Sequence, residues 1–131
     1  MNPYLRNVKS KYILNMENLN DFMLLFRMEL NPNYQPSKEE LVAMKQAWGS
    51  WIGNIGQQAR LVSSHQLGFE GKLVSNDSHV NDGIERHDSK SISGNLVLKA
   101  SDLNEAAEIA KGCPILAMGG TVEVRNTLNV F

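Results

Sequence analysis

The segment from Gly94 to Arg125 constrains the fold of this chain more than any other. Apolar residues alternate over residues 95–100 and again over 121–125, which is the period of a half-buried strand. Between these strands, residues 101–111 carry an alanine-rich apolar seam, which predicts a helix packed tightly on a sheet. We expect Gly112 to end this helix in the left-handed conformation. The segment is therefore predicted to be a strand–helix–strand unit.

Two helices are predicted, and both begin with capping signals. Ser37 and Glu40 have the spacing of a capping box, in which the serine accepts a hydrogen bond from the backbone three residues on. Asp102 and Glu105 have the same spacing, and Ser101 is an alternative cap one residue earlier. These signals place the starts of both helices.

The first half of the chain contains a second strand–helix–strand unit. Residues 22–26 are apolar on both strand faces, which predicts a central strand covered on both sides. Residues 60–67 alternate after the first predicted helix, and we expect them to form a hairpin with residues 72–75. The whole chain therefore has two strand–helix–strand halves around a central hairpin.

A stripe of glycines, Gly49, Gly53 and Gly56, follows one side of the first predicted helix. Each glycine costs a helix about 1 kcal/mol relative to alanine, so the stripe needs a cause. Close packing against the sheet or against a second subunit is one explanation. The alternative is that a ligand approaches the helix backbone.

These elements predict an α+β domain of the ferredoxin-like type, with an antiparallel sheet and two helices on one face. The other face carries Met23, Leu25 and Val97, and we expect a second copy to cover it, making a homodimer. The compact domain is predicted to span residues 21–131. Residues 1–20 are polar and rich in asparagine, and we expect a poorly ordered appendage.

Composition excludes several classes of protein. The 131 residues suit one domain, and a net charge of −1 offers no basic surplus for nucleic acid. No apolar run approaches the roughly 20 residues that cross a bilayer, so no membrane association is expected. The single cysteine, Cys113, excludes an internal disulfide and fits a reducing compartment, which favours the cytoplasm.

Several pieces of sequence, in order along the chain, carry a resemblance to a known family. They are Phe22-Met23-Leu24-Leu25-Phe26-Arg27, Trp48-Gly49 with Trp51-Ile52-Gly53, Gly56 with Leu61-Val62, Gln66-Leu67-Gly68-Phe69-Glu70-Gly71-Lys72, Asp82-Gly83, Glu105-Ala106 through Ala110-Lys111-Gly112-Cys113-Pro114-Ile115-Leu116, and Gly119-Gly120 with Val122-Glu123-Val124-Arg125. These pieces are similar to the YCII-related superfamily, and specifically to its DGPF-domain branch. The resemblance covers about Asp21 to Arg125 and implies a dimeric α+β barrel. The chain departs from the family's Asp-Gly-Pro-aromatic signature, because Ile84 and Glu85 follow Asp82-Gly83.

Three charged residues, Arg27, Glu123 and Arg125, are the best candidates for a binding site. Each lies on a strand face that alternates away from the helix-packed core. An Arg–Glu bridge would explain them, because a buried guanidinium must be paired. An arginine fork for a carboxylate or phosphate is the functional alternative, with Glu123 able to orient Arg27 toward the ligand.

His65 and Asp82 are the candidate pair for acid–base catalysis, because histidine titrates near neutrality and a carboxylate would fix its tautomer. A surface histidine, or one satisfied in the core, is the alternative interpretation. The spacing of the three histidines matches no zinc site, and no cofactor motif is present. Cys113 follows a helix end, where the dipole raises a thiol pKa, so packing is its expected role.

Three functions follow as hypotheses. The first is a non-enzymatic dimeric module, regulatory or ligand-binding, that holds a small anion in a cleft lined by Arg27, His65, Glu123 and Arg125. The second is a small lyase or hydrolase using His65 and Asp82. Relatives in the wider superfamily that this chain resembles use a His–Asp pair, although no family motif places their histidine at His65. The third is a partner of a sigma factor, implied by family members that are described as transcription proteins.

Overall fold

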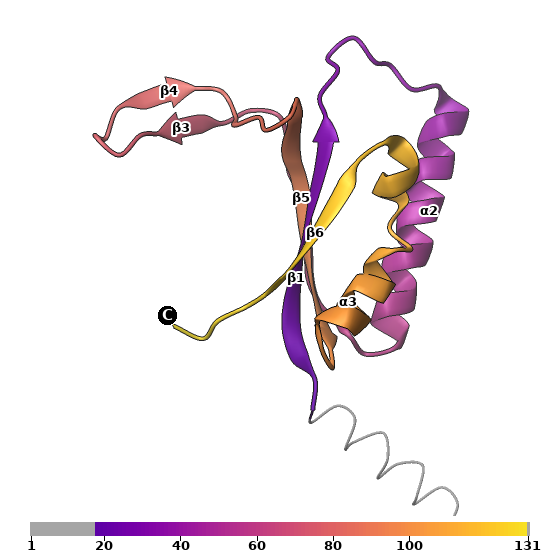
Figure 1. Ribbon diagram of the computed structural model, residues 1–131. Coiled ribbons are helices and arrows are strands. Elements are labelled where there is room, and N and C mark those ends of the chain that lie inside the picture. The colour runs from indigo at the N-terminus through magenta and orange to yellow at the C-terminus, as the bar shows by residue number, and fades with distance from the viewer. Residues whose placement is uncertain (1–17, 131) are drawn as a thin grey trace, which may run out of the picture.

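The computed structural model describes residues 18–130 and arranges them as an α+β fold (Figure 1). The predicted N-terminal appendage lies outside the described residues, except for its last three. In chain order the elements are β1 (Asn20–Glu29), α2 (Lys38–Gln57), β2 (Leu61–Gln66), β3 (Lys72–Val74), β4 (Val80–Asp82), β5 (Lys90–Ala100), α3 (Leu103–Ala110), the 3₁₀ helix η1 (Pro114–Met118) and β6 (Thr121–Asn126).

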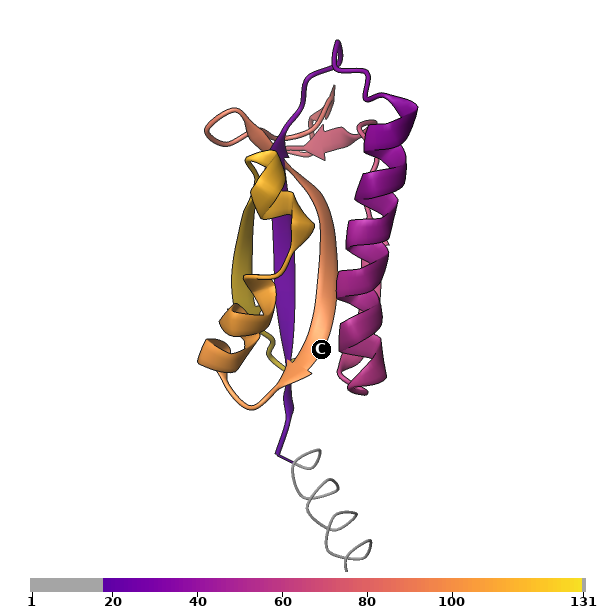
Figure 2. The same ribbon diagram turned by 90° about the vertical axis from the view of Figure 1, so that its right-hand side faces the viewer.

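The sheet has four antiparallel strands in the order β2-β5-β1-β6. Helices α2 and α3 both lie on one face, as the two perpendicular views show (Figures 1 and 2). An α+β fold with an antiparallel sheet and two helices on one face is therefore confirmed. The opposite face has no helix over it in residues 18–130. The predicted cover on both sides of residues 22–26, in β1, is therefore not observed within these residues.

Aromatic rings join α2 to the sheet. The ring of Phe26 lies edge-on to Trp48 and Trp51, with centroid distances of 5.3 and 6.0 Å. The indole Nε1 of Trp51 donates a hydrogen bond of 3.1 Å to the carbonyl of Ile109, which ties α2 to α3. Burial of these rings and of alternate strand residues supplies the hydrophobic stabilisation of the fold. The other large apolar residues of the core are Phe22, Leu24, Ile55, Leu96, Leu98 and Ile115.

Both helices begin where their capping signals predict. The Ser37 hydroxyl accepts a hydrogen bond of 3.1 Å from the backbone N–H of Glu40, and Asp102 accepts one of 2.8 Å from Glu105. These caps satisfy donors that the first helical turn leaves open. The carboxylate of Glu40 accepts a 2.6 Å hydrogen bond from the Tyr34 hydroxyl, which connects the helix to the preceding loop.

The conformation predicted for Gly112 is wrong. The left-handed glycine of this region is Gly119, with φ of 83°, which ends η1, a helix that the sequence analysis did not predict. Gly112 instead lies close against an aromatic ring, because a Cβ there would lie 3.1 Å from Cδ1 of Trp51, tighter than an ordinary van der Waals contact. Its absent side chain therefore lets the helix end pack on the indole.

The central hairpin is also placed differently from the prediction. Strand β2 pairs with β5, and β3 pairs with β4 in a separate two-stranded sheet. The turn lies at residues 75–79, where Ser78 has φ of 70° and the Asp77 carboxylate accepts a hydrogen bond from the backbone of His79. This Asx turn closes β3 onto β4. Strand β5 begins at Lys90, five residues before its predicted start, and β2 pairs with the part of β5 from Gly94 to Leu98.

The glycine stripe of α2 does not pack against the sheet, so that part of its interpretation is wrong. A Cβ at Gly49 or Gly53 would meet nothing within 4 Å, and one at Gly56 would meet only Leu61 at 4.0 Å. Contact with a second subunit or a ligand stays a prediction. On α3, Ala106 and Ala110 are buried as predicted, whereas the other two residues of the expected seam, Leu103 and Ala107, are exposed.

Candidate functional site

The candidate binding residues share the sheet face over which residues 18–130 place no helix (Figure 1). The alternation of β1 buries Leu24 under the helices and turns Leu25 to the opposite face, together with Arg27 two residues on. On the neighbouring strand, Glu123 is the cross-strand partner of Leu25, and Arg125 is the partner of Met23. The sequence alternation therefore placed Arg27, Glu123 and Arg125 on the correct side of the sheet.

Glu123 joins both arginines. Its Oε1 lies 2.6 Å from a terminal guanidinium nitrogen of Arg27, and its Oε2 lies 3.2 Å from one of Arg125. The exposed fractions of the side chains are 27% for Arg27, 40% for Glu123 and 63% for Arg125. The predicted Arg–Glu bridge is confirmed, and it is partly open to solvent rather than enclosed.

The two guanidinium groups lower the pKa of Glu123 below its usual range, chiefly through the hydrogen bond from Arg27 and then through that from Arg125. Glu123 is therefore a carboxylate at neutral pH. One carboxylate between two guanidinium groups leaves a local charge of +1. Each guanidinium carries five N–H donors, so both retain capacity for a further acceptor. The cluster is chemically suited to receive an anion.

His65 lies on the same sheet face, at a distance from this cluster. It pairs with Asn95, Asn95 pairs with Leu25, and Leu25 pairs with Glu123, so one row of residues crosses all four strands. Neighbouring strands are about 4.8 Å apart, which puts the backbones of His65 and Glu123 roughly 14 Å apart. A molecule that contacted both would have to span the sheet.

Asp82 lies outside the main sheet, on β4 of the small hairpin. Its carboxylate pairs with the ammonium group of Lys72, and its side chain is largely exposed. Within residues 18–130, no hydrogen bond or ion pair joins Asp82 to His65. The acid–base hypothesis stays a prediction that no observed contact supports.

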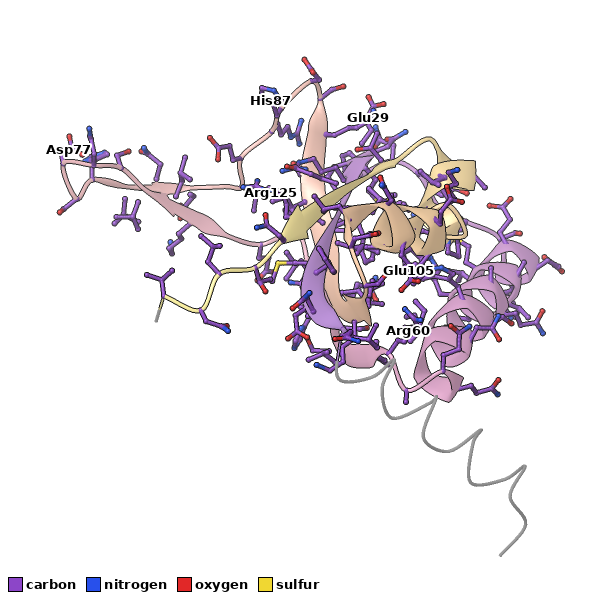
Figure 3. All side chains as sticks on the ribbon, turned by 60° about the horizontal axis from the view of Figure 1, so that its bottom comes forward. Glu29, Arg60, Asp77, His87, Glu105 and Arg125 are labelled. Carbon is purple, nitrogen blue, oxygen red and sulfur yellow. The ribbon has the colours of Figure 1, made fainter. Side chains whose placement is uncertain are left out.

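A second arginine–glutamate pair was not anticipated. Arg60, just before β2, contacts the Glu105 carboxylate and donates a 3.2 Å hydrogen bond to the carbonyl of Lys99. Glu105 also accepts a 3.0 Å hydrogen bond from the backbone of Ser101, so it joins the start of α3 to the end of β5. Arg60 lowers the pKa of Glu105. Figure 3 shows this pair beside the helices, away from Arg125.

Cys113 is buried against the core, and burial raises the pKa of its thiol. Its predicted packing role is confirmed, although burial rather than the helix dipole is the main cause of the shift. A groove of about 580 Å³ runs nearby, between α2 and η1. Its one charged side chain, Lys111, is paired with Glu108 at 2.6 Å. This groove contains none of the candidate site residues.

Neither the search for metal ligands nor the comparison with known proteins assigns a role to a further residue of this chain. Among the residues that the structure describes, no group of three or more His, Cys, Asp or Glu side chains could hold a metal ion. No helix in the same range is long and apolar enough to cross a membrane. The chain matches no protein-family model, and a search of curated proteins finds no significant relative.

Proposed function

We propose that this chain is a cytoplasmic homodimeric module, related to the YCII superfamily and its DGPF branch, that binds a small anionic ligand on the uncovered face of its sheet. The observation that carries the proposal is the cluster in which Glu123 holds Arg27 and Arg125 side by side on that face. His65 lies at the far end of the same surface, so it becomes a fourth contact only for an anion long enough to span the sheet.

The strand order supports a ferredoxin-like arrangement. In chain order the sheet elements are β1, α2, β2, β5, α3 and β6, and their spatial order is β2-β5-β1-β6. Two strand–helix–strand halves that interleave in this way are typical of the split βαβ fold. The small β3–β4 hairpin is then an insertion between the halves.

A dimer through the uncovered face follows from its composition. Met23, Leu25 and Val97 are only half-buried there, side by side on paired strands. A contiguous apolar patch on a sheet face favours an interaction surface. A twofold dimer is the commonest way in which one chain covers such a face. The cleft between two sheets would also shield the arginine cluster from water and strengthen its attraction for an anion.

The ligand class follows from the donors. Two guanidinium groups that share one carboxylate present planar N–H pairs, which match the oxygen atoms of a carboxylate or phosphate. Glu123 fixes their orientation before any ligand arrives, which lowers the entropic cost of binding. A small dicarboxylate or phosphorylated molecule is the proposed class.

The test is to replace Arg27 by alanine and to titrate the dimeric protein with inorganic phosphate and with small dicarboxylates by calorimetry. We expect about tenfold to hundredfold weaker binding, since hydrogen bonds to charged groups contribute about 1.5–3 kcal/mol. Arg86→Ala is the matched control, because it removes the same charge from an exposed loop residue. It should leave binding unchanged.

Two results would contradict the proposal. Equal losses for Arg27→Ala and Arg86→Ala would indicate general charge attraction rather than a site. Unfolding of Arg27→Ala would indicate that the bridge to Glu123 serves stability, and Arg27→Lys, which keeps the charge but not the planar fork, would then be the variant to titrate.

A further inference from the structure

The β3–β4 hairpin stands clear of the rest of the molecule. In Figure 1 it projects from the sheet on the side opposite α2 and α3. Residues 127–130, which follow β6, leave the sheet on the same side but at its other end (Figure 1). The uncovered sheet face therefore lies between two projections of the chain. We call residues 68–84, which include the hairpin, the arm.

The arm has a fixed base. The backbone N–H of Gly83 donates a 2.9 Å hydrogen bond to the carbonyl of Gly71, and Gly83 has φ of 119°, which favours glycine. A Cβ at Gly71 would lie only 2.5 Å from Cγ2 of Ile84, so a side chain there would displace Ile84. These contacts hold the two sides of the arm together where it leaves the body.

The arm exposes apolar side chains that no other segment of residues 18–130 covers. Val74 and Val80 are cross-strand partners, so they lie on the same side of the hairpin, and their exposed fractions are 64% and 52%. A lone hairpin of two three-residue strands is marginal in water unless its apolar side packs on something. The arm therefore needs a second surface to cover the Val74–Val80 side.

Charge indicates which surface this is. The arm carries three carboxylates, Glu70, Asp77 and Asp82, against one ammonium group, Lys72, for a net charge of −2. The uncovered sheet face carries four cations against three anions, for a net charge of +1. The arm and this face are thus complementary, and complementary charge orients association. The charged residues of the face are Arg27, Lys90, Lys99, Arg125, Asp21, Glu29 and Glu123.

We propose that the arm is an exchange arm: in the dimer, the Val74–Val80 side of each arm packs on the uncovered sheet face of the other copy. This inference rests on the homodimer of the proposed function and assigns a contact within it. A twofold axis allows each copy to give its arm and to receive its partner's, so one interface covers both arms and both faces.

The test compares two substitutions that add the same charge on opposite sides of the arm. Val80→Lys places an ammonium group in the proposed contact, whereas Asn81→Lys places it on the other side, beside Leu73. We expect Val80→Lys to raise the dimer dissociation constant about tenfold or more, and Asn81→Lys to change it by less than about threefold. Sedimentation equilibrium over a dilution series measures both, and circular dichroism checks that each variant is folded.

A shortened chain keeps the test decisive if Val80→Lys does not fold. Replacing residues 72–82 by a glycine–serine linker removes the β3–β4 hairpin, and with it the proposed contact side of the arm, and leaves the four-stranded sheet. We expect this variant to be a folded monomer. A wild-type dimer whose dissociation constant is unchanged by Val80→Lys or by hairpin removal overturns the exchange arm and leaves the proposed dimer standing. A wild-type monomer at about 100 µM overturns both, and would leave the arm to a different protein.

Discussion

The two faces of the sheet in this protein are made from the same strands and differ in what covers them. On the face under α2 and α3, Leu24, Leu96 and Leu98 are fully buried. On the other face, their neighbours Leu25 and Val97 are only half-buried. Strand alternation supplies apolar residues to both faces, but within residues 18–130 the helices cover only one of them. The second face is the one that the proposed homodimer would cover.

The same contrast separates the two arginine–glutamate pairs. Glu105 is held by Arg60 and by the backbone of Ser101, and Arg60 also reaches a backbone carbonyl, so that pair fixes α3 to the sheet. Within residues 18–130 the Glu123 carboxylate is bonded to the side chains of Arg27 and Arg125, and Arg125 is mostly exposed. The Arg60–Glu105 pair thus includes backbone partners that hold α3 to the sheet, whereas the cluster on the uncovered face is made of side chains and is partly open to solvent.

The largest effect is expected from alanine substitutions at Leu24 and Leu25, consecutive residues that lie on opposite faces of the sheet. Leu24→Ala should lower the free energy of unfolding by about 2–5 kcal/mol, because the side chain is fully buried and a cavity remains. Leu25→Ala should cost clearly less in the monomer and act mainly by weakening the dimer. Urea denaturation at two protein concentrations separates these effects. Equal, concentration-independent losses would contradict the distinction between the faces.

Replacing a glycine by alanine should lower the free energy of unfolding at a crowded position, Gly120, and raise it at an open position, Gly53. A Cβ at Gly120 would lie 2.6 Å from the carbonyl oxygen of Arg27, so Gly120→Ala should cost about 1–3 kcal/mol of unfolding free energy. Gly53→Ala meets nothing within 4 Å and should gain about 0.5–1 kcal/mol from helix propensity. Thermal denaturation measures both. A loss at Gly53 would indicate that a partner subunit packs on the glycine stripe.

The smallest expected effect concerns pH. The pKa of Glu105 is lowered from its ordinary 4.5, so its contribution to stability is present above that value and is lost as the pH falls through the lowered pKa. Glu105→Gln should therefore be less stable than wild type at neutral pH, with a difference that shrinks in acid. The pair is partly exposed, so the effect is modest. Urea titrations across this pH range measure it, and a difference that persists in acid would exclude charge as the cause.

The sequence predicted the local structure where a few neighbouring residues decide it. Ser37 and Asp102 were identified as caps because the hydrogen bond spans only three residues. The faces of Arg27 and Glu123 followed from strand alternation. The partner of β2 was predicted wrongly, because pairing with β5 depends on residues about 30 positions away, and a nearby return strand was the simpler interpretation. The close packing of Gly112 was missed for the same reason, since the Trp51 ring beside it belongs to another helix.

The sequence by itself determined both α-helices with their starts and the side of the sheet on which Arg27, Glu123 and Arg125 lie, because periodicity and capping are local properties. Only the tertiary structure decided that Glu123 joins Arg27 to Arg125, that Asp82 pairs with Lys72 rather than with His65, and that the β3–β4 hairpin projects beside the uncovered face. These outcomes depend on strand order and register, which bring together residues that no sequence spacing relates.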